Sequence, residues 1–126
     1  MNDHPLFSVI VPTHNGGERL RSSLKTVAMQ VYRNYELIVV CDSCEDNSAE
    51  IAREFTDRVV EVSFQRDGLS RNAGLDIATG DWILFLDDDD FFMHEYVFAM
   101  LADKIQNEIG ENTDAINFSF IWRGRG

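Results

Sequence analysis

The stretch A-T-G-D-W-I-L-F-L-D-D-D-D, residues 78–90, joins an apolar run directly to a run of four acids. Its apolar part, Trp82 to Leu86, contains no polar residue, which is typical of a central parallel strand buried on both faces. Asp87 to Asp90 follow without a spacer, so we expect their carboxylates to begin where the buried interior of a sheet meets its edge. This stretch therefore predicts a parallel sheet with acids at the end of one strand.

The rest of the chain alternates short apolar runs with amphipathic stretches, as the strands and helices of an α/β protein do. We expect further strands at Phe7 to Val11, Glu36 to Cys41, Val59 to Phe64 and Ala115 to Trp122. We expect helices at Glu18 to Val31, at Ile51 to Phe55 after a cap among Asp46 to Ser48, at Leu69 to Ile77 before Gly80, and at Val97 to Ile109. This alternation predicts an α/β fold with a mostly parallel sheet and helices on both faces.

The composition is that of one soluble domain. The chain has 126 residues, of which 44% are hydrophobic and 26% charged, and no apolar segment is long enough to span a membrane. Residues Asn2 to Pro5 do not form the basic region of a signal peptide, so we expect a cytoplasmic protein, at most peripheral at the inner face of the membrane. The net charge of −11, from 11 basic and 22 acidic residues, disfavours binding to nucleic acid or anionic lipid.

The acidic run predicts a site for a divalent cation. Ligands of parallel α/β sheets bind beyond the carboxyl ends of the strands, which is where this run begins. In an extended segment Asp87 and Asp89 point the same way, so they can share one site while Asp88 faces elsewhere. Mg²⁺ or Mn²⁺ prefers oxygen ligands and completes its shell with water and substrate phosphates. The alternative interpretation is a solvated acidic turn.

Polar residues also follow the other predicted strands. Asp42 can accept a hydrogen bond from a base or a ribose, or it can cap the next helix. Arg71 and Asn72 open a helix after Gly68, so they can present a guanidinium and backbone N–H groups to a diphosphate, although a surface arginine explains the sequence equally well. His14 can stack on a ring or stand as an exposed loop histidine.

Cys41 and Cys44 form a C-x-x-C motif at a strand end, where thioredoxin-like redox sites occur. Such a site needs a proline from a later strand, and no proline follows Pro12. A zinc site needs a second pair of ligands, which the sequence does not supply. We therefore expect two reduced cysteines that serve packing.

Four segments resemble the motifs of glycosyltransferase family 2 in their order and spacing. They are V-I-V-P-T-H-N at Val9 to Asn15, V-V-C-D at Val39 to Asp42, S-R-N-A-G-L at Ser70 to Leu75, and residues 78–90. The resemblance covers essentially the whole chain. It implies an inverting enzyme of the GT-A fold, which transfers a sugar from a nucleoside diphosphate sugar, expected to be a UDP-sugar, to a glycan or lipid-linked acceptor.

The resemblance also implies roles for residues of the first three segments. Pro12, Thr13 and His14 match a loop that contacts the nucleobase, with Asn15 beside them and His14 in the place of a usual tyrosine. Asp42 matches an acid that reads the uracil edge, whereas Cys41 replaces the acid before it. Arg71 and Asn72 match a pair near the base and the diphosphate.

For the acidic run, the resemblance implies a D-x-D element. Asp87, Asp88 and Asp89 match it, with Asp89 as the expected ligand of Mn²⁺ or Mg²⁺, together with Asp87, and with Asp88 near the ribose. The family's general base lies further downstream, so no acid of this chain is assigned to it. We expect residues 1–126 to form a single nucleotide-sugar-binding domain, the N-terminal half of a longer catalytic domain shortened at its C-terminal side.

Three other classes of protein compete with this interpretation. The run L-D-D-D-D-F resembles the motif of haloacid-dehalogenase-like phosphatases, with Asp87 as nucleophile and Asp89 as acid/base, but in those enzymes the motif follows the first strand. A receiver domain needs acids after its first strand, where Pro12 and Thr13 stand here. The third alternative is a non-catalytic nucleotide-binding or interaction module.

Overall fold

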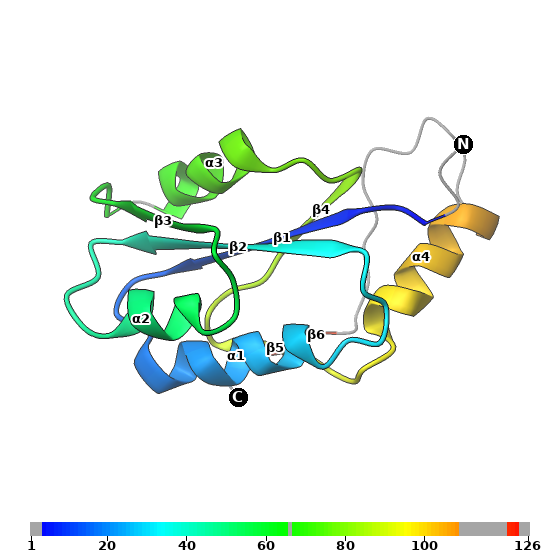
Figure 1. Cartoon of the computed structure of the whole chain (residues 1–126), viewed down its shortest axis with the longest axis horizontal. Coiled ribbons are helices and arrows are strands. Elements are labelled where there is room, and N and C mark those ends of the chain that lie inside the picture. Colours follow the sequence, from blue (N-terminus) through cyan, green and yellow to red (C-terminus); the bar gives the residue numbers. More distant parts are fainter. Residues whose placement is uncertain (1–3, 66, 109–120, 124–126) are drawn as a thin grey trace.

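Four parallel strands form the central sheet in the computed structural model, which describes residues 4–65, 67–108 and 121–123. The strands are β1 (Phe7–Thr13), β2 (Tyr35–Asp42), β3 (Val59–Val62) and β4 (Trp82–Phe85), and their order in the sheet is β3-β2-β1-β4 (Figure 1). Every neighbouring pair of these strands is parallel. The predicted α/β class with a mostly parallel sheet is therefore confirmed.

Helices cover both faces of this sheet, as the sequence predicts. α1 (Gly17–Ala28) and α2 (Ser48–Arg53) lie on one face, and α3 (Asp67–Ile77) lies on the other (Figure 1). Each of these helices connects two parallel strands, and α4 (Val97–Glu108) follows later in the chain. α1 packs on the sheet because Leu20, Leu24 and Val27 recur at helical spacing and are fully buried.

The alternation of side chains along β1 divides the core into two layers. Val9 and Val11 belong to the larger cluster, which includes the apolar residues of α1 and α2. Ile10 points to the other face, where it joins Ile38 and Val40 of β2 in a smaller cluster. Because both faces of β1 are covered, this strand holds the sheet together and fixes the position of the loop that follows it.

The strand that carries the acidic run lies at an edge of the described sheet. β4 pairs with β1 over Phe7 to Ile10, and the side chain of Phe85 is 40% exposed. Within the described residues β4 thus has one neighbour, and the predicted burial of this strand on both faces is wrong. Five consecutive apolar residues show that a strand can be buried, but they do not show where it lies in the sheet. Part of the Phe85 ring is instead covered by the guanidinium of Arg71, 5.9 Å from its centroid.

Several element boundaries differ from the predicted ones. β1 continues through Pro12 to Thr13. The strand can include this proline, which has no N–H to donate, because β1 pairs with β4 only as far as Ile10 and beyond that point pairs with β2. α1 ends at Ala28, and the N–H of Val31 donates instead to the carbonyl of Glu95 (3.0 Å). β3 ends at Val62, two residues before the predicted end.

The last part of the chain differs most from the expected pattern. β5 (Asp90–Phe92), which the sequence pattern does not predict, pairs antiparallel with β6 (Ile121–Arg123). Residues 115–120 of the predicted final strand lie outside the described residues, as does Ile109 of the predicted last helix. A three-residue strand is too short to produce a recognisable period of apolar residues, and β5 begins within the acidic run, so the sequence pattern does not indicate it.

Gly74 allows α3 to lie close to the sheet. A Cβ atom at this position would lie 2.6 Å from Cγ2 of Ile10 and 3.3 Å from Cγ2 of Val40. We therefore expect Gly74→Ala to lower the free energy of unfolding by about 1–3 kcal/mol, the usual effect of overpacking. Urea unfolding measures this change. Gly68→Ala on the same helix is the control, because nothing lies within 4 Å of its Cβ position. Equal stability of the two variants would contradict this close packing.

Glu36 anchors the end of the sheet that lies away from the acidic run. Its Oε2 accepts hydrogen bonds from Ser8 Oγ (2.5 Å) and the Thr79 N–H (2.6 Å). Burial alone would raise the pKa of Glu36, but these hydrogen bonds, with Arg58 nearby, outweigh burial and lower the pKa.

This lowered pKa makes the stability of the domain depend on pH. A carboxyl whose pKa is lower in the folded state stabilises the fold above its unfolded pKa, about 4.3, and this contribution is lost as the pH falls through the folded pKa. We expect Glu36→Gln to flatten this acid limb in urea unfolding at a series of pH values. Glu50→Gln, at an exposed position of α2, should retain the limb. An unchanged limb in Glu36→Gln would contradict the assignment.

Candidate functional site

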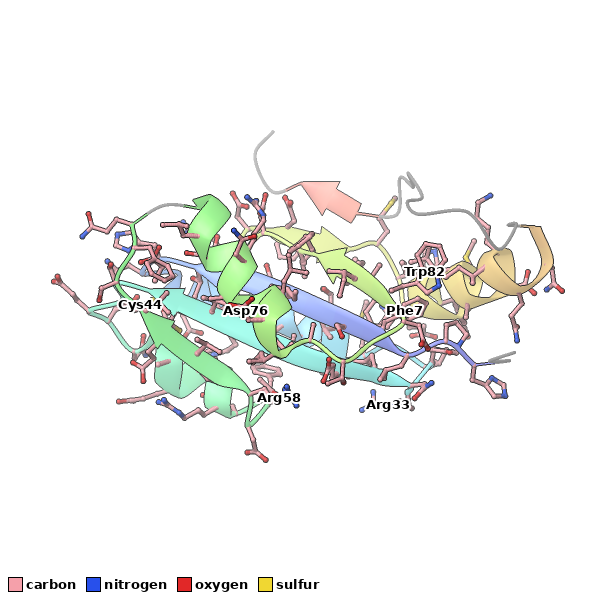
Figure 2. The ribbon with its side chains drawn as sticks, turned by 90° about the horizontal axis from the view of Figure 1, so that it is seen from above. Phe7, Arg33, Cys44, Arg58, Asp76 and Trp82 are labelled. Atoms are coloured by element: carbon pink, nitrogen blue, oxygen red, sulfur yellow. The ribbon has the colours of Figure 1, made fainter. Side chains whose placement is uncertain are left out.

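A cavity of about 780 Å³ opens at the carboxyl ends of β1, β2 and β4. Figure 2 shows Cys44 at this end of the sheet, opposite Phe7 and Trp82. Eight of the predicted site residues line the cavity, which confirms that they lie together at one edge of the sheet. They are Pro12, Thr13, His14, Asp42, Arg71, Asp87, Asp88 and Asp89.

The acidic run folds into a turn that gathers three carboxylates. The N–H of Asp90 donates to the carbonyl of Asp87 (3.0 Å), and carboxylate oxygens of Asp87, Asp89 and Asp90 lie within 4.8 Å of one another. Asp90 is 2% exposed and was not predicted, because an extended segment would point it away from Asp87. Repulsion among clustered carboxylates favours a bound cation, and an oxygen-only ligand set suits Mg²⁺ or Mn²⁺.

Asp88 lines the same cavity but is not part of this carboxylate group, and it joins the acidic turn to the loop after β1. Its Oδ2 accepts a hydrogen bond from Thr13 Oγ1 (2.6 Å) and lies 3.4 Å from the guanidinium of Arg19. Gly16 lies against this contact, since a Cβ there would be 2.4 Å from Thr13 Oγ1. The hydroxyl of Thr13 is therefore used to hold Asp88, and the predicted contact of Thr13 with a base stays a prediction.

Asp42 is the centre of a hydrogen-bonded wall of the cavity. Its carboxylate is 5% exposed, and Oδ1 accepts from the N–H groups of Phe64 (2.7 Å) and Gln65 (2.8 Å). Oδ2 accepts from the hydroxyl of Ser70 (2.7 Å). These contacts join the end of β2 to the loop before α3 and to α3 itself. Asp42 does not cap α2, because the N–H of Ser48 donates to Asp46 Oδ1 instead (3.0 Å).

Arg71 brings a positive charge to the cavity beside the acidic turn. Its guanidinium lies 3.2 Å from Asp87 Oδ1 and is about one-third exposed. A guanidinium in this place can bind an anion in the cavity, because one side of it contacts a carboxylate and the other side is exposed. Asn72, the other residue of the predicted pair, is exposed and does not line the cavity.

His14 and Asn15 have different places in the loop after β1. His14 Nδ1 lies 2.8 Å from the carbonyl oxygen of Asp42, so this nitrogen carries a proton and Nε2 is the acceptor of the neutral ring. Asn15 lies outside the lining of the cavity. Its Oδ1 accepts from the N–H groups of Glu45 (2.7 Å) and Asp46 (3.3 Å), so Asn15 ties the loop after β1 to the loop after β2.

The two cysteines are free thiols that pack at the base of these loops. Cys41 is buried in the larger core cluster, and Cys44 packs against the same cluster. Burial, and then the neighbouring Cys44, raises the pKa of Cys41 to about 12, which keeps the thiol protonated at neutral pH. Cys44 Sγ donates to the carbonyl of Thr13 (3.6 Å). This arrangement agrees with the packing interpretation and not with a redox site.

Three further lining residues were not predicted: Arg19, Gln65 and Ser70. Arg19 lies in the first turn of α1, where the sequence pattern assigns it to a solvated face. Gln65 has a φ of 56°, which turns the chain after β3 toward the cavity. Ser70 stands next to a predicted residue, so a search for hydroxyls beside Arg71 would have found it.

The parallel α/β sheet, with an acidic turn and a guanidinium in one cavity at the carboxyl ends of its strands, has the architecture of the GT-A fold. The sequence model of the family described as Glycosyl transferase family 2 matches residues 8–116. The chain therefore belongs to glycosyl transferase family 2.

Comparisons with known proteins agree with this assignment. Glycosyltransferase GlyA of Streptococcus pneumoniae is 38% identical over 105 residues, which are 79% of this chain and 15% of that protein. The structure of residues 1–349 of S. aureus TarS in complex with UDP-GlcNAc matches with a TM-score of 0.74 and 29% identity, over 79% of this chain and 31% of that chain. This chain thus spans less than half the length of these two proteins.

A third comparison supports the fold alone. Mannosyltransferase PcManGT of Pyrobaculum calidifontis, solved in complex with GDP-Man and Mn²⁺, matches with a TM-score of 0.72 and 23% identity, over 82% of this chain and 32% of that chain. The structural matches confirm the predicted GT-A fold. The family match confirms the resemblance to family 2, and it favours this family over the phosphatase and receiver alternatives. No helix within the described ranges is long and apolar enough to cross a membrane.

Proposed function

We propose that this chain binds the donor of a glycosyltransferase, a nucleoside diphosphate sugar, together with Mn²⁺ or Mg²⁺. The observation that carries this proposal is the meeting of Asp87, Asp89 and Arg71 in the cavity at the carboxyl ends of the strands. Membership of family 2 supports the reaction type, and the TarS structure in complex with UDP-GlcNAc supports UDP as the nucleotide.

Electrostatics explains how this acidic chain can bind an anionic donor. The chain has a net charge of −11, and the carboxylates of the acidic turn would repel a diphosphate. A divalent cation held by Asp87 and Asp89 would neutralise the charge of these two carboxylates and would supply coordination positions for phosphate oxygens. Arg71 adds a second positive group on the same side of the cavity. The Mn²⁺ named with the Pyrobaculum mannosyltransferase supports this choice of metal.

The remaining lining residues suit the nucleoside. His14 presents an acceptor nitrogen and a ring face at the opening of the cavity, and Pro12 lies beside it. Asp42 fixes one wall of the cavity through its contact with Ser70, and Thr13 fixes the loop after β1 through its contact with Asp88. These contacts maintain the shape of the cavity in which a base and a ribose fit. Two predicted residues lie outside the lining of the cavity. Asn15 acts indirectly, because it ties the loop after β1 to the loop after β2, and Asn72 lies on the exposed side of α3.

In the transfer reaction, the bond between the sugar and the diphosphate breaks and negative charge develops on the leaving group. The metal would supply charge stabilisation for that group, and Arg71 would stabilise the same charge from the protein. The acceptor, a glycan or a lipid-linked sugar, must also lose a proton to a general base. We assign the donor side of this reaction to residues 1–126 and name no general base among them.

Calorimetric titration tests this proposal. We expect UDP to bind in the presence of Mn²⁺ and to lose about tenfold or more in affinity when EDTA removes the metal. GDP and ADP, titrated in the same way, should bind more weakly than UDP if the loop after β1 selects the base. An affinity for UDP that does not change with EDTA would contradict the proposal, because the acidic turn would then have no part in binding.

A further inference from the structure

Three polar side chains of α1 and its C-terminal end face the protein interior. They are Ser23, Thr26 and Gln30, which are spaced by three and four residues and so lie on one face of the helix. Ser23 is fully buried and Gln30 is 1% exposed. Buried polar groups are costly unless they are hydrogen-bonded, so the partners of these three side chains indicate what they do.

Ser23 and Thr26 bind the backbone of the acidic turn and of β5. Ser23 Oγ lies 2.8 Å from the carbonyl oxygen of Asp88 and 2.6 Å from that of Asp90, so its single hydroxyl proton is shared between these two acceptors. Thr26 Oγ1 accepts from the N–H of Phe92 (3.1 Å) and donates to the carbonyl of Ser23 (2.7 Å). The hydroxyl groups of α1 thus serve as hydrogen-bond partners for backbone groups of the acidic turn and of β5.

Gln30 continues the same row to the start of α4. Its Nε2 donates to the carbonyl of His94 (2.8 Å), and its Oε1 accepts from the N–H of Phe98 (3.0 Å). The three side chains therefore bind backbone groups over residues 88–98 in the order of the sequence. None of the three lines the cavity.

We propose that Ser23 and Thr26 are positioning residues for the metal site, an inference that rests on the proposed function. Ser23 holds the two carbonyl groups on either side of Asp89, so it fixes the direction in which that carboxylate leaves the backbone. Thr26 accepts a hydrogen bond from the N–H of Phe92, two residues further along the chain. The carboxylates of Asp87 and Asp89 then face the cavity before a ligand arrives, which removes the cost of ordering them during binding.

Loss of the Ser23 hydroxyl would affect the acidic turn more than the rest of the fold. In Ser23→Ala the carbonyls of Asp88 and Asp90 lose the donor that Ser23 supplies, and the turn is then free to shift toward water. This movement would take Asp89 with it. Outer-shell partners of metal ligands commonly change metal affinity by about 10–100-fold when they are removed, so we expect an effect of this size on UDP binding with Mn²⁺.

Ser23→Ala and Thr56→Val form the matched pair of the experiment. Thr56 Oγ1 also joins two backbone groups, since it donates to the carbonyl of Leu37 (2.7 Å) and accepts from the N–H of Arg58 (3.1 Å), but it lies far from the acidic turn in the fold. Hydrogen exchange of the Asp90 and Phe92 amides is measured without ligand, and UDP affinity is measured at saturating Mn²⁺. Thr26→Val, which keeps its volume, is the second test variant.

Ser23→Ala is expected to speed exchange of these two amides and to weaken UDP binding about tenfold, whereas Thr56→Val changes neither. Thr26→Val should show the same pattern with a smaller loss. Unchanged exchange and affinity in both α1 variants would overturn the positioning role, as would an equal loss of affinity in Thr56→Val. A parent chain that takes up no UDP with Mn²⁺ would overturn the proposed function, whereas exchange alone still tests the hold of Ser23 on the turn.

Discussion

Asp89→Asn is expected to abolish the part of UDP binding that depends on Mn²⁺, a loss as large as the one that EDTA causes in the parent chain, about tenfold or more. An amide oxygen carries no charge, so the substitution removes a ligand and leaves Asp87 and Asp90 to hold the cation without it. The side chain keeps its size, and the turn is held by backbone contacts of Asp87, Asp88 and Asp90, so the fold should be retained. Calorimetric titration with and without EDTA measures the change.

Asp76→Asn is the matched control for this prediction. Asp76 lies on α3, which covers one face of the sheet (Figure 2), and it is exposed and absent from the lining of the cavity. The two variants change the net charge equally, so a general electrostatic effect would appear in both. If Asp89→Asn kept the metal-dependent affinity of the parent, the acidic turn would not be the metal site.

Asp42→Ala is expected to lower the free energy of unfolding by about 2–4 kcal/mol, because it leaves several polar groups without an acceptor. The N–H groups of Phe64 and Gln65 and the hydroxyl of Ser70 all donate to this carboxylate. The same substitution should also weaken UDP binding, since the wall of the cavity between β2 and α3 is no longer held.

Asp42→Asn separates the structural role of this residue from its role in binding. An amide oxygen can still accept from the N–H groups of Phe64 and Gln65, so most of the stability should remain. Urea unfolding measures the stability of both variants, and calorimetry measures their affinity for UDP. If Asp42→Ala were as stable as the parent chain, the contacts seen around this carboxylate would not support the fold.

The general fold could be predicted from the sequence because its elements leave strong periodic patterns. Leu20, Leu24 and Val27 mark α1 by their spacing, and the apolar runs mark the strands. The edge position of β4 could not be predicted in this way. Phe85 would be equally apolar in a central strand, and only the order of strands shows that, within the described residues, β4 has a neighbour on one side alone.

The candidate site was predictable where residues follow strands and not where the chain turns. Asp42 and Asp87 stand directly after apolar runs, so the rule that ligands bind at carboxyl ends placed them together. Asp90 joins the acids through a turn, which a linear sequence does not reveal. Ser23 and Gln30 are polar residues beside the apolar stripe of α1, and the sequence does not reveal their partners, which are backbone groups far along the chain.

The most direct test of the central claim is the EPR spectrum of Mn²⁺ during titration with the parent chain and UDP. The claim is that a cation held by Asp87 and Asp89 joins the diphosphate to this chain. We expect the signal of free Mn²⁺ to fall in proportion to the chain when UDP is present, and to return on addition of excess Mg²⁺. UDP bound by the chain while all Mn²⁺ stays free would contradict the account.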